Sequence, residues 1–211
     1  MPRPEYTRSE EIANSLTHGV GAALSVAALS ILVTFAALHG DAWQVVSFAI
    51  YGATLILLYV ASTLYHALRS PRAKHAMRVL DHTAIFLLIA GTYTPLTLVT
   101  LRGPWGWTLF GLVWGIAIAG VTFKAFTTGR LERASLAFYI AMGWLAVIAI
   151  KPLLAALPVG ALLWILMGGV FYTGGVLFYR WHRLPYHHAV WHLCVLGGSA
   201  CHFICMLGYV A

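Results

Sequence analysis

The sequence predicts an all-α membrane protein in which seven helices cross the bilayer as one bundle. Hydrophobic residues make up 61% of the 211-residue chain and charged residues only 9%, too few to cover a water-soluble domain. The apolar residues fall into seven runs, each close to the length of helix that crosses a hydrocarbon core. Short loops between these runs hold most of the charge, which is typical of a polytopic membrane protein.

Each run ends at a charged or proline-containing break. The first run follows residues 1–11, which lack the apolar core and cleavage site of a removable signal peptide, so we expect it to remain as a span. No linker or internal repeat is visible, so residues 1–211 are expected to form a single domain. The spans are expected at residues 17–38, 43–66, 80–101, 105–125, 134–150, 156–179 and 188–210. The breaks after the first six are 39–41, 69–78, 102–104, 124–133, 151–152 and 180–183.

The positive charge is distributed unequally between the two sides of this topology. Of the 13 Lys and Arg residues, 11 lie in the N-terminal segment and in the breaks after the second, fourth and sixth spans. Only Arg102 and Lys151 lie on the other side. The positive-inside rule therefore predicts a cytoplasmic N-terminus and an external C-terminus. The net charge of +7 does not indicate nucleic-acid binding, because the basic residues do not cluster with stacking aromatic residues.

Polar residues gather at one depth of the expected bundle. Four helices from distant parts of the sequence carry them at the cytoplasmic end, where buried ionisable groups are costly and usually serve a function. The pairs and triplet concerned are Asn14 and His18, Ser62 and His66, Asp81 and His82, and His187, His188 and His192.

The histidine spacing predicts a metal site. His188 and His192 are one helical turn apart on the same face, and His66 lies at the same depth on another helix. Three imidazoles and one water complete the tetrahedral shell of an open zinc site. Zinc suits imidazole ligands, and no cysteine stands in position to favour a softer metal. Zn²⁺ is therefore the expected cofactor.

Three motifs carry a family resemblance. They are Glu11-x-x-Asn14-x-x-x-His18, Ser62-x-x-x-His66 followed by Asp81, and His188-x-x-x-His192. In this order and at this depth, they resemble the signature of the progestin and adipoQ receptor family. The short tails and the Pro185-Tyr186-His187-His188 stretch resemble its bacterial branch, the haemolysin III proteins.

The resemblance implies a seven-helix protein of the bacterial plasma membrane with zinc near the cytoplasmic face. His66, His188 and His192 would be the metal ligands, Asp81 would hold the metal-bound water, and Ser62 would lie beside it. A ligand ring usually needs an oriented partner on its other nitrogen. We therefore expect Asn14, His18 and Glu11 to orient the ligand histidines.

The expected chemistry is zinc-dependent hydrolysis of a membrane lipid. The wider superfamily includes alkaline ceramidases, which cleave a lipid amide, so a ceramidase-like hydrolase acting in lipid homeostasis is the leading hypothesis. Asp81 is the candidate general base, and Ser62 is the candidate hydrogen-bond donor to the developing oxyanion. Membrane lipids are the expected partners.

Two other classes of function stay open at this level. The first is a receptor-like sensor of membrane state in which zinc is structural, which would require Asp81 as a fourth ligand. The second is a pore-forming haemolysin. Against a pore, His202 is the only ionisable residue that continues the polar path into the outer leaflet.

Overall fold

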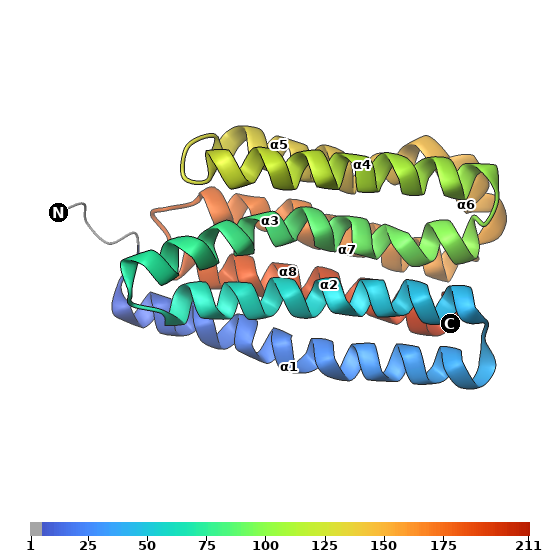
Figure 1. Cartoon of the computed structure of the whole chain (residues 1–211), viewed down its shortest axis with the longest axis horizontal. Helices are drawn as coiled ribbons and strands as arrows, with labels where there is room; N and C mark the ends of the chain where they lie inside the picture. The colour runs from blue at the N-terminus through green and yellow to red at the C-terminus, as the bar shows by residue number, and fades with distance from the viewer. Residues whose placement is uncertain (1–5) are drawn as a thin grey trace.

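The computed structural model describes residues 6–211, which form a bundle of helices lying side by side (Figure 1). In this part of the chain, seven helical spans are long and apolar enough to cross a membrane, as the sequence predicted. The start of α1 and the C-terminus lie at opposite ends of the bundle (Figure 1). We refer below to the end that holds Tyr6 and the loop before α8 as the site end.

Helical segments cover almost all of the described chain. The α-helices are α1 (Arg8–His39), α2 (Ala42–Ala67), α3 (Pro71–Pro95), α4 (Pro104–Thr127), α5 (Glu132–Gly143), α6 (Ile150–Ala156), α7 (Val159–Arg180) and α8 (His187–Cys205). Two π-helical turns, η1 (Leu96–Thr100) and η3 (Met206–Val210), extend α3 and α8, and a 3-10 segment, η2 (Leu145–Ala149), joins α5 to α6.

Two helices begin well before the apolar spans that the sequence predicted. α1 begins at Arg8 because Thr7 and Glu10 form a capping box, in which each side chain binds the backbone N–H of the other residue. α3 begins at Pro71, a favourable first helical residue because its missing N–H would have no partner in the helix anyway. The extra turns at the starts of α1 and α3 carry polar residues and lie at the site end of the bundle.

The fifth and sixth spans differ from the prediction at their shared boundary. The expected fifth span, 134–150, extends over Glu132–Ala156, and the sixth begins at Val159 rather than at 156. Pro152 does not end the fifth span, because η2 lets a new helix start at Ile150 and places the proline in its first turn. The sixth starts late because Pro158 holds the preceding residue, Leu157, in an extended conformation.

The packing order brings α8 against the first helices of the chain. α1 packs on α2, α2 on α3, α3 on α4 and α7 on α8, and α8 also contacts α1. α7 and α8 approach closely at Gly198, where a Cβ would lie 2.7 Å from the Tyr172 ring. Large apolar side chains such as Leu16, Leu163 and Leu177 are exposed on the outer helices, as expected for surfaces that face lipid.

Candidate metal centre

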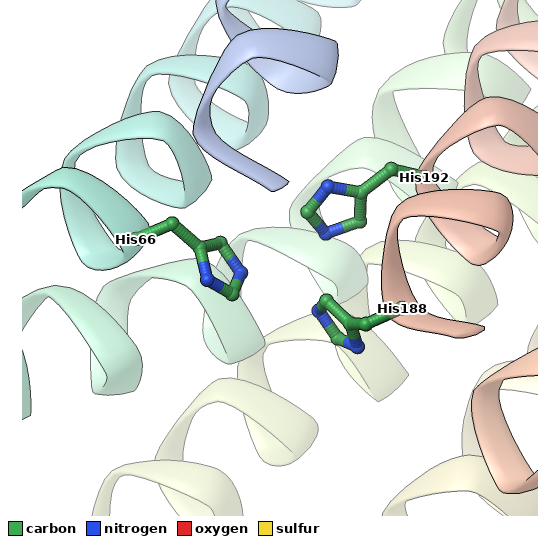
Figure 2. Close-up of side chains that lie close together, drawn as sticks. All are labelled: His66, His188 and His192. Carbon is green, nitrogen blue, oxygen red and sulfur yellow. The ribbon is translucent and has the colours of Figure 1, made fainter. Parts of the chain in front are cut away.

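Three buried histidines converge at the site end of the bundle. His66 comes from the last turn of α2, and His188 and His192 come from the first two turns of α8. Each offers one ring nitrogen, and these three atoms all lie within 4.8 Å of one another. Figure 2 shows one nitrogen of each ring pointing toward the space between the three rings. The predicted histidine cluster is therefore present in the structure as a group that could hold a metal ion.

The turn before α8 places two of these histidines. Tyr186 adopts a left-handed backbone conformation, with φ of 56°, and α8 begins at the next residue. Its backbone N–H donates to Oε1 of Glu10, so the turn is attached to the start of α1. From there, the four-residue spacing puts His188 and His192 on one face. His187 faces elsewhere, with its Nδ1 lying 3.1 Å from the carbonyl oxygen of Phe178 in α7.

The Nδ1 atom of His66 is held by a charged group from α1. It lies 2.6 Å from Oε2 of Glu11, and Oε1 of the same carboxylate accepts a 2.7 Å hydrogen bond from Lys74. The Asn14 side-chain nitrogen lies 3.5 Å from the same His66 atom. Because a carboxylate can only accept, Nδ1 of His66 carries the hydrogen of this bond.

His192 is held in the same way by the next turn of α1. Its Nδ1 lies 3.1 Å from the backbone carbonyl oxygen of Asn14 and 3.1 Å from Oγ1 of Thr17. The Thr17 hydroxyl donates to backbone carbonyls of its own helix, so toward His192 it acts as an acceptor. The carbonyl acceptor fixes the tautomer of His192, with the hydrogen on Nδ1 and the lone pair on Nε2.

His18 lies parallel to His192 on the cavity side of the site. The two ring centroids are 3.5 Å apart with an interplanar angle of 12°, and the His18 ring also meets Tyr59 edge-on at 4.9 Å. Among the described residues, neither ring nitrogen of His18 has a hydrogen-bond partner. The structure therefore brings His18 to the site as a stacking neighbour of a histidine in the cluster.

A cavity extends from the histidines into the bundle between α3, α5, α7 and α8. His188 and His192 line it together with Ser62 and Asp81. Aliphatic, tyrosine and tryptophan side chains form much of the remaining wall, which also includes the polar residues His18, His82, Glu132 and His202. The hydroxyl of Ser62 is fully buried and interacts with the Asp81 carboxylate. The Asp81 carboxylate does not belong to the group of atoms within 4.8 Å, so the cluster has three members in the described chain.

Sequence reasoning missed three residues that contact this site. Tyr6, Thr17 and Lys74 hold His188, His192 and Glu11 respectively. Thr17 follows Asn14 by three residues on α1, and this spacing alone could have placed it on the same face. No comparable signal marks Tyr6, which lies outside α1 and 182 positions before its partner.

A second polar cluster lies beside the cavity, around a lysine that the sequence placed where the expected fourth span, 105–125, meets the following loop. Lys124 belongs to the last turn of α4 and is fully buried. Its Nζ donates to Oε2 of Glu132 at 2.6 Å and to the Ser135 hydroxyl at 3.1 Å. Nε2 of His82 lies 3.9 Å from the same Glu132 oxygen. This ion pair connects α4 to α5 beside the cavity wall.

The fold and the site define a multi-pass helical membrane protein with a buried three-histidine centre. The family described as haemolysin-III related matches residues 6–203. Hemolysin-3 of Bacillus cereus is 52% identical over 210 residues, which cover 100% of this chain and 96% of that protein. The Hemolysin-3 homolog of Bacillus subtilis (strain 168) is 47% identical over 204 residues, which cover 97% of this chain and 96% of that protein.

Similarity extends to animal proteins. The human monocyte to macrophage differentiation factor is 26% identical over 214 residues, which cover 99% of this chain and 87% of that protein. The chain therefore belongs to the haemolysin-III-related family, and the family assignment predicted from the three motifs is confirmed.

Proposed function

We propose that this protein is a zinc-dependent hydrolase that cleaves an amide or ester bond in a membrane lipid. One observation carries the proposal: two of the three clustered histidines, His188 and His192, line a mainly apolar cavity that Ser62 and Asp81 also line. A lipid could place its acyl chain along the apolar walls and its carbonyl group at the histidines.

The donor set fits zinc. Structural and catalytic zinc sites use neutral imidazoles, and sites with three protein ligands leave a fourth position for water or substrate. Ligands at the usual bond length of about 2.0–2.1 Å, in tetrahedral geometry, lie about 3.4 Å apart. The histidine nitrogens lie within 4.8 Å of one another and would have to move closer together to reach that spacing.

The tautomers also fit. Glu11 holds Nδ1 of His66, and the Asn14 carbonyl holds Nδ1 of His192, so both rings would bind the ion through Nε2. When bound, zinc would polarise the substrate carbonyl and lower the pKa of a coordinated water toward about 7.

Two cavity residues would supply the remaining chemistry. Asp81 would accept the proton that the attacking water loses and return it to the leaving amine or alcohol. Ser62, which lies on the cavity wall beside Asp81, would donate its hydrogen bond to the carbonyl oxygen as negative charge develops. His18 would keep the His192 ring in its plane by stacking on it.

The proposed location is the bacterial plasma membrane, with the site end facing the cytoplasm. The loops α2–α3, α4–α5 and α7–α8 lie at this end, and together with the helix ends that flank them they carry most of the Lys and Arg residues of the chain. Positively charged short loops are retained on the cytoplasmic side during insertion. A lipid headgroup of the inner leaflet would then lie level with the histidines.

The second candidate function is a sensor of membrane state in which zinc is structural. It is favoured by the contacts that join α1, α2 and α8 through the histidines, because a metal there would lock three helices together. It is disfavoured by the number of ligands, since structural zinc usually has four protein ligands and the described cluster has three.

The test combines metal analysis with an assay of turnover. Wild-type protein, the His188→Ala/His192→Ala double variant and Asp81→Asn would be purified in lipid nanodiscs and analysed for zinc. The same samples would be incubated with ceramides and other acyl lipids, and released fatty acid would be measured. The hydrolase proposal expects about one zinc per wild-type chain, zinc-dependent product, and an Asp81→Asn variant that keeps zinc and loses product. Zinc without product across the panel would favour the sensor.

A further inference from the structure

The N-terminal segment, residues 6–11, lies across the histidine cluster and contacts it at several points. The ring of Tyr6 has centroid distances of 5.9 Å to His66 and 5.0 Å to His188. Its hydroxyl oxygen lies 3.1 Å from Nδ1 of His188. Tyr6 therefore touches two members of the cluster that come from different helices.

The segment is anchored on both sides of the cluster. On one side, Glu11 binds His66 of α2 and Lys74 of α3. On the other side, Glu10 accepts the backbone N–H of Tyr186, immediately before α8. Because the capping box of Thr7 and Glu10 continues directly into α1, the position of Tyr6 is fixed by the same contacts that start the helix.

The three histidines share one pattern of support. The Nδ1 atoms of His66 and His192 face a carboxylate and a carbonyl group, which are obligatory acceptors. The Nδ1 atom of His188 faces the Tyr6 hydroxyl, which can accept as well as donate. If His188 binds the ion through Nε2 as the other two do, its Nδ1–H donates to the Tyr6 oxygen.

We propose that Tyr6 is a positioning residue of the metal centre, which orients the His188 ring and covers the ion from the aqueous side. This inference rests on the proposed zinc site but not on the proposed hydrolysis, because it concerns only how the ion is held. The hydroxyl sets the tautomer and rotation of His188. The ring, packed against two histidines, restricts the path by which water or a chelator reaches the ion.

Removing the hydroxyl and removing the ring of Tyr6 should have different effects on metal binding. Tyr6→Phe removes the acceptor and keeps the covering ring, whereas Tyr6→Ala removes both. Loss of an outer-shell partner typically lowers metal affinity about 10–100-fold. We expect Tyr6→Phe to weaken zinc binding about 10-fold, and Tyr6→Ala to weaken it further and to speed zinc release about 100-fold relative to wild type.

The experiment measures the metal in the absence of any lipid substrate. Full-length wild type, Tyr6→Phe and Tyr6→Ala would be loaded with zinc in nanodiscs, and zinc affinity and release to a colorimetric chelator would be followed. Cobalt(II) loading would report the ligand geometry through its visible absorption spectrum. Tyr209→Phe is the matched control, because Tyr209 is exposed and lies in η3, far from the histidines along α8.

The outcomes separate this inference from the proposed function. Weaker zinc binding and an altered cobalt spectrum in Tyr6→Phe, with Tyr209→Phe unchanged, would support it. Affinity, release rate and spectrum equal to wild type in Tyr6→Phe would overturn it, whatever the hydrolysis assay gives. A wild-type protein that binds no zinc would overturn both the metal centre and the role of Tyr6, whereas bound zinc without lipid hydrolysis would overturn the hydrolase alone.

Discussion

The carboxylate of Glu11 lies between His66 and Lys74, 2.6 Å from Nδ1 of the histidine and 2.7 Å from Nζ of the lysine. The three residues belong to α1, α2 and α3, so one side chain joins three helices at the site end. Glu11 was expected to support the site because it precedes Asn14 and His18 on one helix face. The structure adds that it contacts a member of the histidine cluster directly.

Glu11→Gln should weaken metal binding without preventing folding. The neutral amide is a poorer acceptor for His66 than a carboxylate, and it leaves Lys74 without its counter-charge. We expect zinc affinity to fall about 10-fold in a competition titration with a chelator of known affinity. Asp41→Asn, in the loop before α2, is the control and should bind zinc as wild type does. If Glu11→Gln and wild type bind zinc with equal affinity, Glu11 does not support the metal site.

Single substitutions in the histidine cluster should lower both zinc content and thermal stability. A ligand that binds only the folded state at 100 times its Kd stabilises that state by about 2.7 kcal/mol. His66→Ala and His188→Ala should lose this contribution and should no longer respond to added zinc in a thermal-shift measurement. His39→Ala, on the exposed end of α1, should respond as wild type does. Full zinc retention in His188→Ala would contradict the ligand assignment.

Ser62→Ala should slow turnover and spare metal binding. Removing one hydrogen-bond donor to a developing oxyanion typically lowers kcat about 10²–10³-fold. Ser47→Ala is the control, because Ser47 is also a fully buried serine of α2 but does not line the cavity. Initial rates of fatty-acid release would be compared. A similar loss in both variants would indicate packing rather than catalysis.

Glu132→Gln should destabilise the bundle through Lys124. Breaking one side of a buried ion pair costs about 3–5 kcal/mol, and the cost should be lower here because the Glu132 side chain is 28% exposed. Chemical denaturation in detergent would measure the loss. Lys124→Met/Glu132→Leu, which removes both charges, should recover most of it. If the single and double variants unfold alike, the pair contributes little to stability.

Surface labelling tests the proposed orientation. In a background without Cys194, Cys201 and Cys205, single cysteines would replace His39 and Arg130, which are exposed at opposite ends of the bundle. A maleimide that cannot cross membranes, added to intact bacterial cells, should label the cysteine at position 39 and not the one at position 130 until the cells are opened. The reverse pattern would place the histidines on the external side.

The seven spans and the histidine cluster could be predicted because both depend on patterns that can be recognised in the amino-acid sequence alone. Apolar run length gives the spans, and the alternation of loops places the end of α2 and the start of α8 at the same end. The i, i+4 spacing of His188 and His192 then requires only a third imidazole, which His66 supplies.

What could not be predicted depends on backbone atoms and on long-range packing. The acceptor for His192 is the main-chain oxygen of Asn14, which no side-chain pattern reveals. Lys124 was placed at the end of the expected fourth span, but its burial could not be predicted, because it depends on the position of Glu132 after the turn. The early start of α1, by contrast, was visible in the Thr7-x-x-Glu10 capping box.

The contacts of the N-terminal segment also determine when the centre can be completed during synthesis. Tyr6 and Thr17 are made before their partners, which follow 182 and 175 positions later. Because a chain is made at about 5–20 residues per second, the segment waits about ten seconds or more for α8. Completion of the histidine cluster is therefore a late event, and a chain truncated before α8 would lack two of its three histidines.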